Sequence, residues 1–434
     1  MQFNKSFFSV VKSVAEWTKP FFIRPLIFTY QRRCARSIKR LQRQNKNGKS
    51  PIRVAFLQMY ITSNQDIPVF ERMLADKNFD PYFIVYPDYY RAKSFSDDIY
   101  RRTKSFLEDK YGIERVLAGK CGDIYIDFTD KFDMMTTNNP YANMTPPQFR
   151  IEYWTRKGIP SFYISYFYMG RCYVTEWNLK MLSFSCFWRI FVENNYVIKI
   201  AKQCQVLKGR NCILTGCLKM DAYLDIVPVP RTRKRILVAP HHTIEPSEVS
   251  VGCFMEYADK FLDLVQSFPQ VDFVFRPHPQ LRQKLAGSQK LKGLIPWGEK
   301  KTNAYFDALR KEPNLIISEE GDYLQEFADS DALIHDSGSF LAEYLYTGKP
   351  CAYVYRNTIN REKTFKELGE KCIAAHYVMY CHDDVKRFVQ SVVLDGNDEK
   401  KVEREQFAKR EIMVNYPHSS DIVLKHIKNA LGMA

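Results

Sequence analysis

Apolar residues occur along most of the chain in short runs that alternate with segments of helical spacing. From residue 52 onward the runs end in polar, Gly or Pro turns, and the segments after them place apolar residues three or four positions apart. Such alternation predicts parallel β-sheets with helices on both faces. The pattern restarts after Pro228 and Pro230. We therefore expect an α/β protein with two doubly wound, Rossmann-like domains, 51–228 and 229–434, behind an N-terminal arm of residues 1–50.

Both domains are expected to alternate strands and helices along their length. In the first we expect strands at 52–58, 83–86, 122–127, 132–137 and 161–166, and helices at 67–76, at 100–111, in a segment ending at 157, from 177 to about 194, and on to 207. In the second we expect strands at 236–239, 271–275, 315–317, 332–335 and 351–355, and helices at 254–268, 302–310, 323–328, 339–346 and 423–431. Ligand contacts are expected in the loops that follow the strands.

The arm of residues 1–50 has its own pattern. Apolar residues from Phe3 to Phe21 recur every three or four positions, which predicts an amphipathic helix ending near Pro20, and an apolar patch, 21–30, and a basic tract, 31–49, follow. No run is long enough to span a bilayer, and no secretory cleavage site is present. We favour binding to an anionic membrane surface. The alternatives are a helix docked on the protein's own body and, less favoured, contact with nucleic acid.

Charge and cysteine content narrow the class of protein. The formal net charge is +15, but the arm holds 12 of the 64 Lys and Arg and one acid, Glu16, so the rest of the chain is nearly balanced. A nucleic-acid partner is therefore not expected. The 11 cysteines form no C-x-x-C pair, which indicates reduced thiols in a cytosolic compartment and no metal site. All eight histidines lie at or after His241, so the first domain has none.

One stretch, Asp331–Pro350, stands out as a strand, a tight polar turn, a helix and a Gly-Lys-Pro stop, with strand 351–355 directly after it. Backbone N–H groups at such a helix start converge on one point, and Ser337 and Ser339 add hydroxyl donors, which favours a phosphate. Glu343, one turn into the helix, is placed to reach the ribose attached to that phosphate. The alternative is an ordinary capped helix start with a solvated Glu.

Several motifs of the second domain occur together in a fixed order. They are Ala239-Pro240 followed by a hydroxyl residue, Arg276-x-His278-Pro279, Ser318-x-x-x-x-Tyr323 and Asp336-Ser-x-Ser339, preceded by Thr215-Gly216-x-x-Lys219-x-Asp221. This series resembles the CDP-glycerol glycerophosphotransferases, the teichoic acid and capsule polymerases, over residues 210–360. The resemblance implies a GT-B fold, with the two domains facing across a cleft. The Asp336–Ser339 turn with Glu343 also resembles the phosphate and ribose site of the wider GT-B group.

The resemblance implies an activity and a set of site residues. Glycerol phosphate, or a related alditol phosphate, would pass from a CDP-linked donor to a hydroxyl of a lipid-linked surface polymer at the cytoplasmic face of the membrane, releasing CMP without cofactor or metal. His278 matches a histidine that acts at the transferring phosphate, and once protonated it would neutralise charge there together with Arg276. The expected nucleotide and phosphate contacts are His242, Thr243, Arg276, Ser318, Asp336, Ser337, Gly338, Ser339 and Glu343. At most one of the adjacent His241 and His242 is expected to face the site, and His335 is expected to be structural.

The chain departs from the family pattern in its first domain. The family's His-Gly-Thr-Pro motif, whose histidine is the expected base for the acceptor hydroxyl, is absent. Tyr166, in the loop Ser165–Tyr168, occupies its place in chain order, and Asp88, after the second strand, is the better base chemically. Two other readings stay open: a GT-B glycosyltransferase that uses a nucleotide sugar, and a catalytically inactive membrane-bound partner protein.

Overall fold

The chain divides into two compact units in a computed structural model that describes residues 5–46, 51–60, 65–245, 251–288, 296–318, 323–356 and 361–433, with side chains from residue 23 onward. The first unit comprises Met1–Phe167, Glu176–Lys219 and His418–Ala434, and the second comprises Tyr168–Thr175 and Met220–Pro417. The second domain was expected to be the continuous segment 229–434. Instead, the C-terminal segment belongs to the first unit, and Tyr168–Thr175 belongs to the second.

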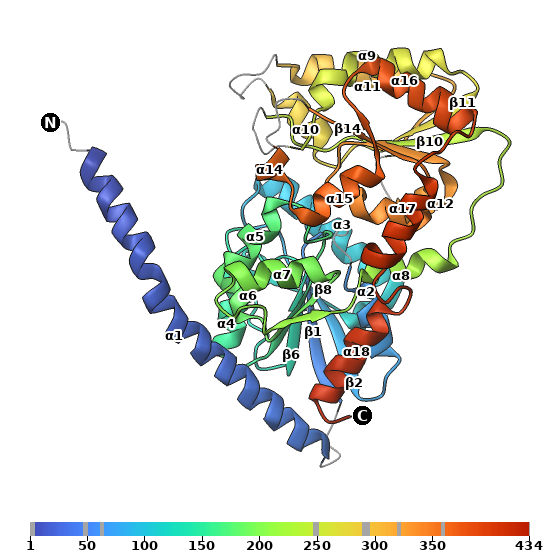
Figure 1. Cartoon of the computed structure of the whole chain (residues 1–434). Coiled ribbons are helices and arrows are strands. Elements are labelled where there is room, and N and C mark those ends of the chain that lie inside the picture. The colour runs from blue at the N-terminus through green and yellow to red at the C-terminus, as the bar shows by residue number, and fades with distance from the viewer. Residues whose placement is uncertain are drawn as a thin grey trace. The chain divides into compact units, whose positions relative to one another are not determined.

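The first unit contains a seven-stranded sheet in which all neighbouring strands are parallel, in the order β3-β2-β1-β6-β7-β8-β9 (Figure 1). Its strands are β1 Ile52–Gln58, β2 Phe79–Val85, β3 Val116–Ala118, β6 Met134–Thr137, β7 Ser161–Ile164, β8 Arg189–Val192 and β9 Cys212–Leu214, and a small hairpin pairs β4 Lys120–Cys121 with β5 Ile124–Tyr125. Phe83 on β2, Phe56 on β1 and Phe162 on β7 are fully buried, and Phe70 of helix α2, Ile67–Leu74, stacks on Phe83.

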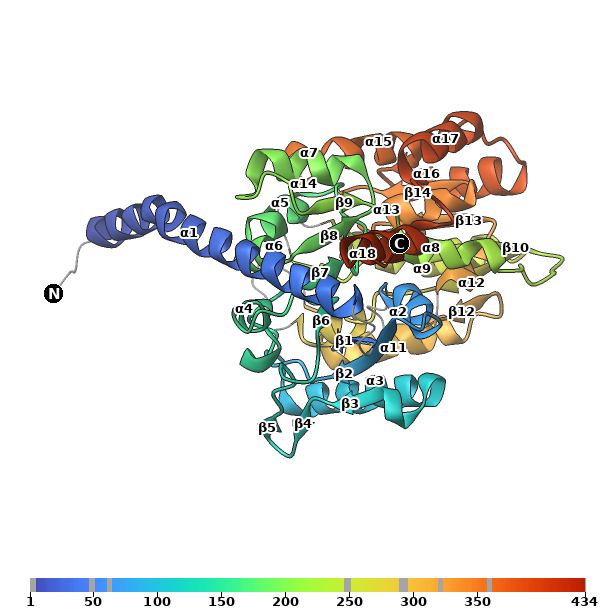
Figure 2. The same cartoon turned by 90° about the horizontal axis from the view of Figure 1, so that it is seen from below.

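Helices of the first unit are α1 Lys5–Lys46, α2 Ile67–Leu74, α3 Lys93–Tyr111, α4 Ile151–Arg156, α6 Leu182–Cys186, α7 Asn195–Cys204 and α18 Ser419–Ala430, while α5 Tyr173–Lys180 and α8 Leu218–Asp221 cross a unit boundary. Figure 2 shows α18 beside α2, and Val423 and Ile427 are buried in the core of this unit. The prediction of one helical span from Trp177 to Asn194 was wrong, because β8 lies within it. Strand β3 was missed.

The second unit contains a six-stranded parallel sheet in the order β12-β11-β10-β13-β14-β15. Its strands are β10 Lys234–Ala239, β11 Val271–Phe275, β12 Leu315–Ile317, β13 Ala332–His335, β14 Cys351–Val354 and β15 Tyr377–Met379. Its helices are α9 Phe254–Ser267, α10 Leu281–Ala286, α11 Gly298–Arg310, α12 Tyr323–Asp329, α13 Phe340–Glu343, α14 Arg361–Thr364, α15 Glu367–Ala375, α16 His382–Arg387 and α17 Lys401–Phe407. The prediction of two doubly wound, Rossmann-like sheets is confirmed.

Helix α1 is longer than predicted and does not end near Pro20. From residue 23 onward it packs along α4 and α6 (Figure 1), with Ile27, Tyr30, Cys34, Ile38 and Leu41 buried. Their spacing of three or four residues forms one continuous apolar stripe. This packing offsets the backbone hydrogen bonds that prolines remove from a helix, so the basic tract is helical rather than a solvated linker.

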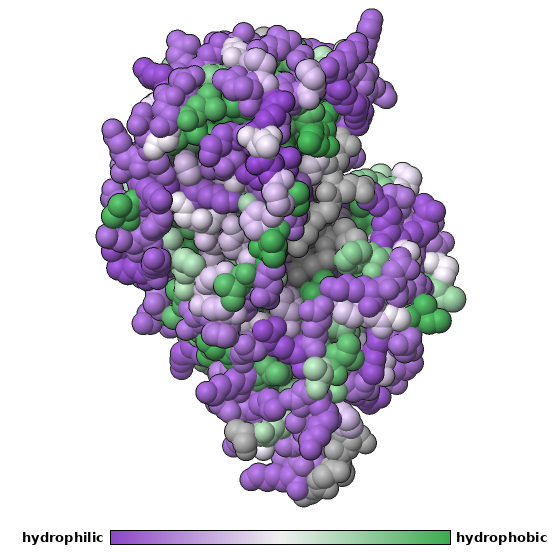
Figure 3. Space-filling view, turned by 90° about the vertical axis from the view of Figure 1, so that its right-hand side faces the viewer, coloured by the Kyte–Doolittle hydropathy of each residue, from purple (hydrophilic) through white to green (hydrophobic). Residues whose placement is uncertain are grey.

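Hydrophilic residues predominate on the face shown in Figure 3, and the apolar residues there form small separate groups. Among the residues that the structure describes, no helix combines the length and hydrophobicity that a membrane crossing requires.

Candidate nucleotide and phosphate site

Three loops of the second unit meet at the carboxyl edge of its sheet. Strand β10 pairs with β11 and β13 so that Val238 lies opposite Phe275 and Ile334, and the three strands end within two residues of this level. The loops that follow begin at Pro240, Arg276 and Asp336. Strands β11 and β12 are added on one side of β10, and β13, β14 and β15 on the other. The point between β10 and β13, where the strand order reverses, is where open α/β sheets bind ligands.

Three histidine rings from two of these loops contact one another. The centroid of His242 lies 4.2 Å from that of His241 and 4.1 Å from that of His278, and the outer pair are 5.5 Å apart. Both adjacent histidines therefore belong to the cluster, although at most one was expected to face the site. Residues 240–243 follow β10 and form neither helix nor strand, so adjacent side chains there need not point to opposite sides.

Hydrogen bonds fix which nitrogen of two of these rings carries the proton. Nδ1 of His278 accepts from the backbone N–H of Gln280 at 3.2 Å. Nδ1 of His241 accepts from the backbone N–H of Thr243 at 3.3 Å and lies 2.9 Å from its hydroxyl, which in turn accepts from the N–H of Gly252. In the neutral form both rings therefore carry the proton on Nε2, which is left to face a ligand.

Burial disfavours the charged form of two of these histidines, His241 and His278. Burial lowers the pKa of His278 to about 4, and the Lys284 ammonium adds to the effect. Burial also lowers the pKa of His241 well below its usual value, and the charges of His242 and His278 add to it. A protonated His278, as expected at the transferring phosphate, therefore requires a nearby negative charge. A bound phosphate would raise these pKa values, because negative charge favours the imidazolium form.

Asp336 organises the loops rather than facing a ligand. Its buried carboxylate accepts from the backbone N–H of His241 at 2.5 Å and from that of Cys253 at 2.6 Å. Burial raises its pKa to about 6. Gly252 is required in the same loop, because a Cβ there would overlap the Thr243 carbonyl. Asp336 thus ties the start of α9 and the histidine loop to the end of β13.

An arginine that was not predicted contacts the predicted phosphate turn, Asp336–Ser339, which we call the serine turn. The guanidinium of Arg171 donates to the Ser339 hydroxyl at 3.2 Å, and a Cβ on Gly338 would overlap it. Ser339 precedes α13 without capping it through its side chain, and no described residue bonds the Ser337 hydroxyl. The turn therefore holds a cation in contact with the Ser339 hydroxyl, two residues after Ser337, and this combination suits a phosphate.

Arg171 is held rigidly on this turn by its own segment, Tyr168–Thr175. Its carbonyl accepts from the N–H of Lys366 at 2.8 Å and lies against Gly369, where a Cβ would not fit. Cys172 forms a β-bridge with Phe365. The one feature of the sequence that could have indicated Arg171 is its position directly after Gly170, three residues beyond the loop Ser165–Tyr168.

The remaining predicted donor contacts lie in two paired networks. Arg276 donates to Glu326 at 2.8 Å and to the Ser318 hydroxyl at 3.2 Å, so Glu326 offsets much of its charge. Glu343 is buried and accepts from the Tyr323 hydroxyl at 2.6 Å. These contacts shape the wall of the site, and they leave Arg171 as the cation on the serine turn.

The two base candidates of the first unit lie on different strands. Asp88 follows β2 and accepts from the Tyr60 hydroxyl and from the backbone N–H groups of Tyr90 and Arg91. Tyr166 follows β7, and its hydroxyl lies 3.1 Å from that of Tyr141. Strands β1 and β6 lie between β2 and β7 in the sheet, so the two candidates come from strands that are not neighbours.

A buried carboxyl group that was not predicted lies at the reversal point of the first sheet, between β1 and β6. Both oxygens of Asp66 accept from the Gln58 amide at 2.8 Å, and the Gln58 oxygen accepts from Asn138 at 2.6 Å. Burial raises the pKa of Asp66 to about 7. Gln58 ends β1 and Asn138 follows β6, which was the available sequence signal.

No three His, Cys, Asp or Glu side chains gather as a metal-binding group within the described ranges. The chemistry that the second unit offers is therefore hydrogen bonding and positive charge from Arg171, two serine hydroxyls and neutral histidines that can take up protons. This set suits the binding of a diphosphate and the stabilisation of charge on a leaving phosphate.

No family model and no curated protein matches the sequence. Solved structures do match. A variant of the wall teichoic acid polymerase TagF is 12% identical with a TM-score of 0.58, over 96% of this chain and 98% of that one. A UDP-N-acetylglucosamine 2-epimerase is 12% identical with a TM-score of 0.56, over 89% and 97% of the two chains. The UDP-GlcNAc 2-epimerase from Neisseria meningitidis bound to UDP-GlcNAc is 14% identical with a TM-score of 0.54, over 87% and 100%. The chain therefore has a GT-B-like fold with two Rossmann-like units.

Proposed function

We propose that this protein is a transferase that moves an alditol phosphate, glycerol phosphate in the first instance, from a CDP-linked donor to a hydroxyl of a lipid-linked surface polymer. The observation that carries the proposal is the convergence of Arg171, Ser337 and Ser339 beside the histidine cluster at the reversal point of the second sheet. The polymerase among the structural neighbours supports the same class of reaction.

The proposed step exchanges one phosphorus–oxygen bond for another. The acceptor oxygen bonds to the alditol-bearing phosphorus, the bond from that phosphorus to the bridging oxygen breaks, and CMP leaves with the electron pair. The acceptor proton passes to solvent or to a carboxylate. Arg171 and Ser339 would hold the diphosphate, and Nε2–H of His278 would donate to the oxygen on which charge develops.

Charge balance gives His278 a role that depends on the ligand. With an empty site the ring is neutral, since burial lowers its pKa to about 4. The donor's diphosphate brings at least one negative charge next to it, which favours protonation of the ring. Donor binding would then take up a proton, and the imidazolium would neutralise the departing CMP. No metal is needed for this step in the proposal.

A nucleotide-sugar enzyme is the second candidate, either a glycosyltransferase or an enzyme that acts on the sugar itself. Two observations favour it: the epimerases are as similar in fold as the polymerase, and one of them was solved with UDP-GlcNAc bound. The first unit also lacks the histidine of the glycerophosphotransferase motif. Both candidates use the same serine turn and differ in the base of the nucleotide and in the bond that breaks.

The proposed site of action is the cytoplasmic face of the membrane, with the protein bound peripherally through its basic N-terminal helix. The outer face of α1 carries the exposed side chains of Arg32, Arg36, Lys39, Arg40 and Arg43. Each basic residue near an anionic bilayer contributes about 1 kcal/mol to binding. A membrane location would bring the enzyme to its lipid-linked acceptor.

Calorimetric titration of the full chain with CDP, CMP and UDP in metal-free buffer tests the proposal. We expect CDP and CMP to bind more tightly than UDP, and radiolabelled glycerol phosphate to pass from CDP-glycerol to a lipid-linked primer. Preferential binding of UDP would replace the proposal with the nucleotide-sugar reading. Absence of binding by all three nucleotides would leave neither activity standing and would favour an inactive partner protein.

A further inference from the structure

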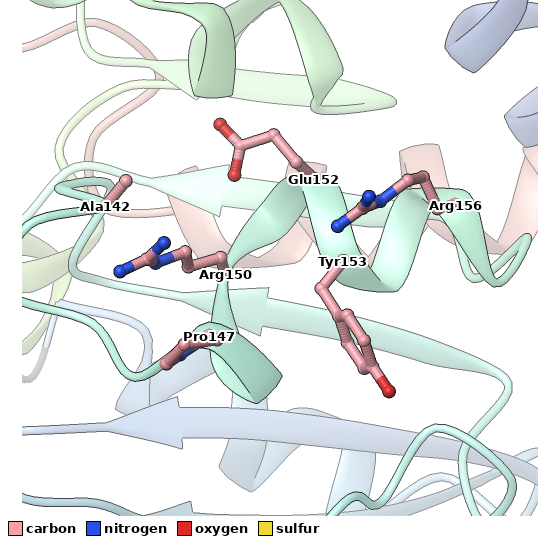
Figure 4. Close-up of a pocket in the computed structure, with 6 residues that line it drawn as sticks. All are labelled: Ala142, Pro147, Arg150, Glu152, Tyr153 and Arg156. Carbon is pink, nitrogen blue, oxygen red and sulfur yellow. The ribbon is translucent and has the colours of Figure 1, made fainter.

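A pocket of about 330 Å³ lies in the first unit, whereas the serine turn belongs to the second. It is lined by Ala142, Pro147, Arg150, Glu152, Tyr153 and Arg156 (Figure 4). Three of these residues project from helix α4, and Arg150 directly precedes it. The pocket is larger than a single phosphate group and has both positive and negative charge in its wall.

The two arginines of the pocket have unused donors. Arg150 donates through Nε to the Thr145 carbonyl at 3.0 Å, and its two outer nitrogens contact no acceptor among the described residues. The Arg156 side chain, which is exposed, forms no hydrogen bond or ion pair with any residue that the structure describes. Guanidinium groups prefer bidentate contacts with phosphate oxygens, so this wall is suited to a phosphate.

Glu152 restricts which phosphate the pocket accepts. It lies between the two arginines in sequence and lines the same pocket, and within the described part of the chain its carboxylate has no hydrogen-bond or ion-pair partner. A carboxylate repels a bare phosphate but accepts hydrogen bonds from hydroxyl groups. The combination therefore favours a phosphate ester that carries free hydroxyls, as glycerol phosphate does.

Helix α1 borders this pocket. Its Arg33 donates to the Arg156 carbonyl at 2.9 Å, and Ser37 donates to the Gly158 carbonyl at 2.5 Å. Burial raises the pKa of Tyr30, and the charges of Arg156 and Glu152 also act on this phenol, which places it near the pocket. Leu26 and Phe28 are 39% and 40% exposed on the same helix. A helix with an exposed basic face and exposed apolar side chains suits the surface of an anionic bilayer.

From these contacts we infer that the pocket is a lipid headgroup site. It binds a phosphate ester bearing free hydroxyls, and its source is a membrane lipid of the phosphatidylglycerol type, because the pocket adjoins helix α1; this step rests on the proposed membrane binding of that helix. Arg150 and Arg156 hold the phosphate, and Glu152 accepts from the headgroup hydroxyls. The site does not depend on the proposed transferase activity. It would give membrane binding a headgroup preference that charge alone does not provide.

Vesicle co-sedimentation of the full chain tests the inference. The vesicles contain phosphatidylcholine with either phosphatidylglycerol or phosphatidylserine at the same surface charge. We expect the natural protein to prefer phosphatidylglycerol. Arg150→Gln combined with Arg156→Gln should abolish that preference and lower the affinity for phosphatidylglycerol vesicles more than tenfold, from about fivefold for each cation. Arg53→Gln, which removes an exposed charge at the start of β1, should keep the preference.

Glu152→Ala separates headgroup recognition from simple attraction. Loss of a negative charge should strengthen binding to both kinds of vesicle if attraction alone operates. The pocket predicts the opposite for phosphatidylglycerol, namely weaker binding. Equal binding of the natural protein to both vesicle types, or stronger binding of Glu152→Ala to both, would overturn the inference.

The source of the phosphate ester is tested with soluble glycerol 3-phosphate by calorimetry. Binding that depends on Arg150 and Arg156, combined with vesicle binding that does not, would assign the pocket to a soluble polyol phosphate and would overturn the lipid assignment. Melting curves of each variant show whether it folds, and the exposed Arg156 is expected to contribute least to the melting temperature, whereas Arg150 also donates to the Thr145 carbonyl.

Discussion

Arg171→Gln is the perturbation that most directly tests the proposed donor site. The guanidinium is 7% exposed and lies 3.2 Å from the Ser339 hydroxyl, over a glycine that leaves it room. A hydrogen bond to a charged group contributes about 1.5 to 3 kcal/mol. If Arg171 binds the diphosphate, its loss should weaken CDP binding by a factor of about 10 to 100. Arg171→Lys keeps the charge and loses the bidentate fork, so its affinity for CDP should lie between those of the natural protein and Arg171→Gln.

Calorimetry with CDP measures this loss, and two controls separate binding from folding. Ser339→Ala removes a hydroxyl from the same turn and should reduce affinity less than loss of the cation. Thermal denaturation without ligand reports how much of the Arg171 effect is structural. A spectroscopic readout is also available, because the positive charge of Arg171 is among the groups that lower the pKa of His241. Arg171→Gln should therefore raise the pKa of His241, as measured by NMR titration.

The reasoning would be refuted by one clear pattern. If Arg171→Gln folds, raises the pKa of His241 and still binds CDP as tightly as the natural protein, the guanidinium is near the histidines without touching the ligand. The serine turn would then bind phosphate through its hydroxyl and backbone groups alone. A loss of affinity matched by an equal loss in Arg361→Gln, an arginine paired with Glu370 elsewhere in the unit, would point to a general charge effect.

Three further predictions follow from the same contacts. Gly338→Ala places a Cβ against the guanidinium and should weaken CDP binding as much as Arg171→Gln does, and unchanged affinity in calorimetry would contradict the packing. Ser339→Ala should weaken nucleotide binding more than His335→Ala, since His335 is fully buried, and the reverse order in calorimetry would misplace the site. The pKa of Asp66 is raised to about 7, so the folded state holds an extra proton between about pH 4 and 7, and stability falls as pH rises through this range. Asp66→Asn should therefore gain stability relative to the natural protein as denaturation is moved from pH 5 to pH 8, and a constant difference would show that Asp66 titrates normally.

The two sheets could be predicted because their strands are short apolar runs bounded by turns. Strand β10 and strand β13 each end at a polar residue or proline, and the prediction placed both correctly. Strand β8, Arg189–Val192, was missed because two residues separate it from helix α6 and it is mostly buried, so its short apolar run has no period of its own. Helix α1 continues beyond its prolines because packing against the first unit stabilises it, and the local sequence does not show that packing.

The site could be predicted only where its residues follow strands of one sheet. The serine turn, His242 and His278 were predicted in this way, because parallel strands end at the same edge. Arg171 was not found, since its segment leaves the neighbours it has in sequence and joins the second unit. The charge state of His278 could not be predicted either, because it depends on burial, which a sequence does not show. The protonated form belongs to the ligand-bound state if the proposal is correct.

The missing histidine of the first unit bears differently on the two candidate reactions. Positioning and neutralisation of charge supply most of the catalysis in enzymatic phosphoryl transfer. Direct displacement at a sugar carbon by a hydroxyl depends more on a base that activates the nucleophile. The oxygens of Asp88 already accept hydrogen bonds from Tyr60, Tyr90 and Arg91, and Asp66 is 1% exposed. The charge-stabilising groups are therefore assembled in the second unit, while neither carboxylate of the first is positioned as an open base. That imbalance favours phosphate transfer over glycosyl transfer.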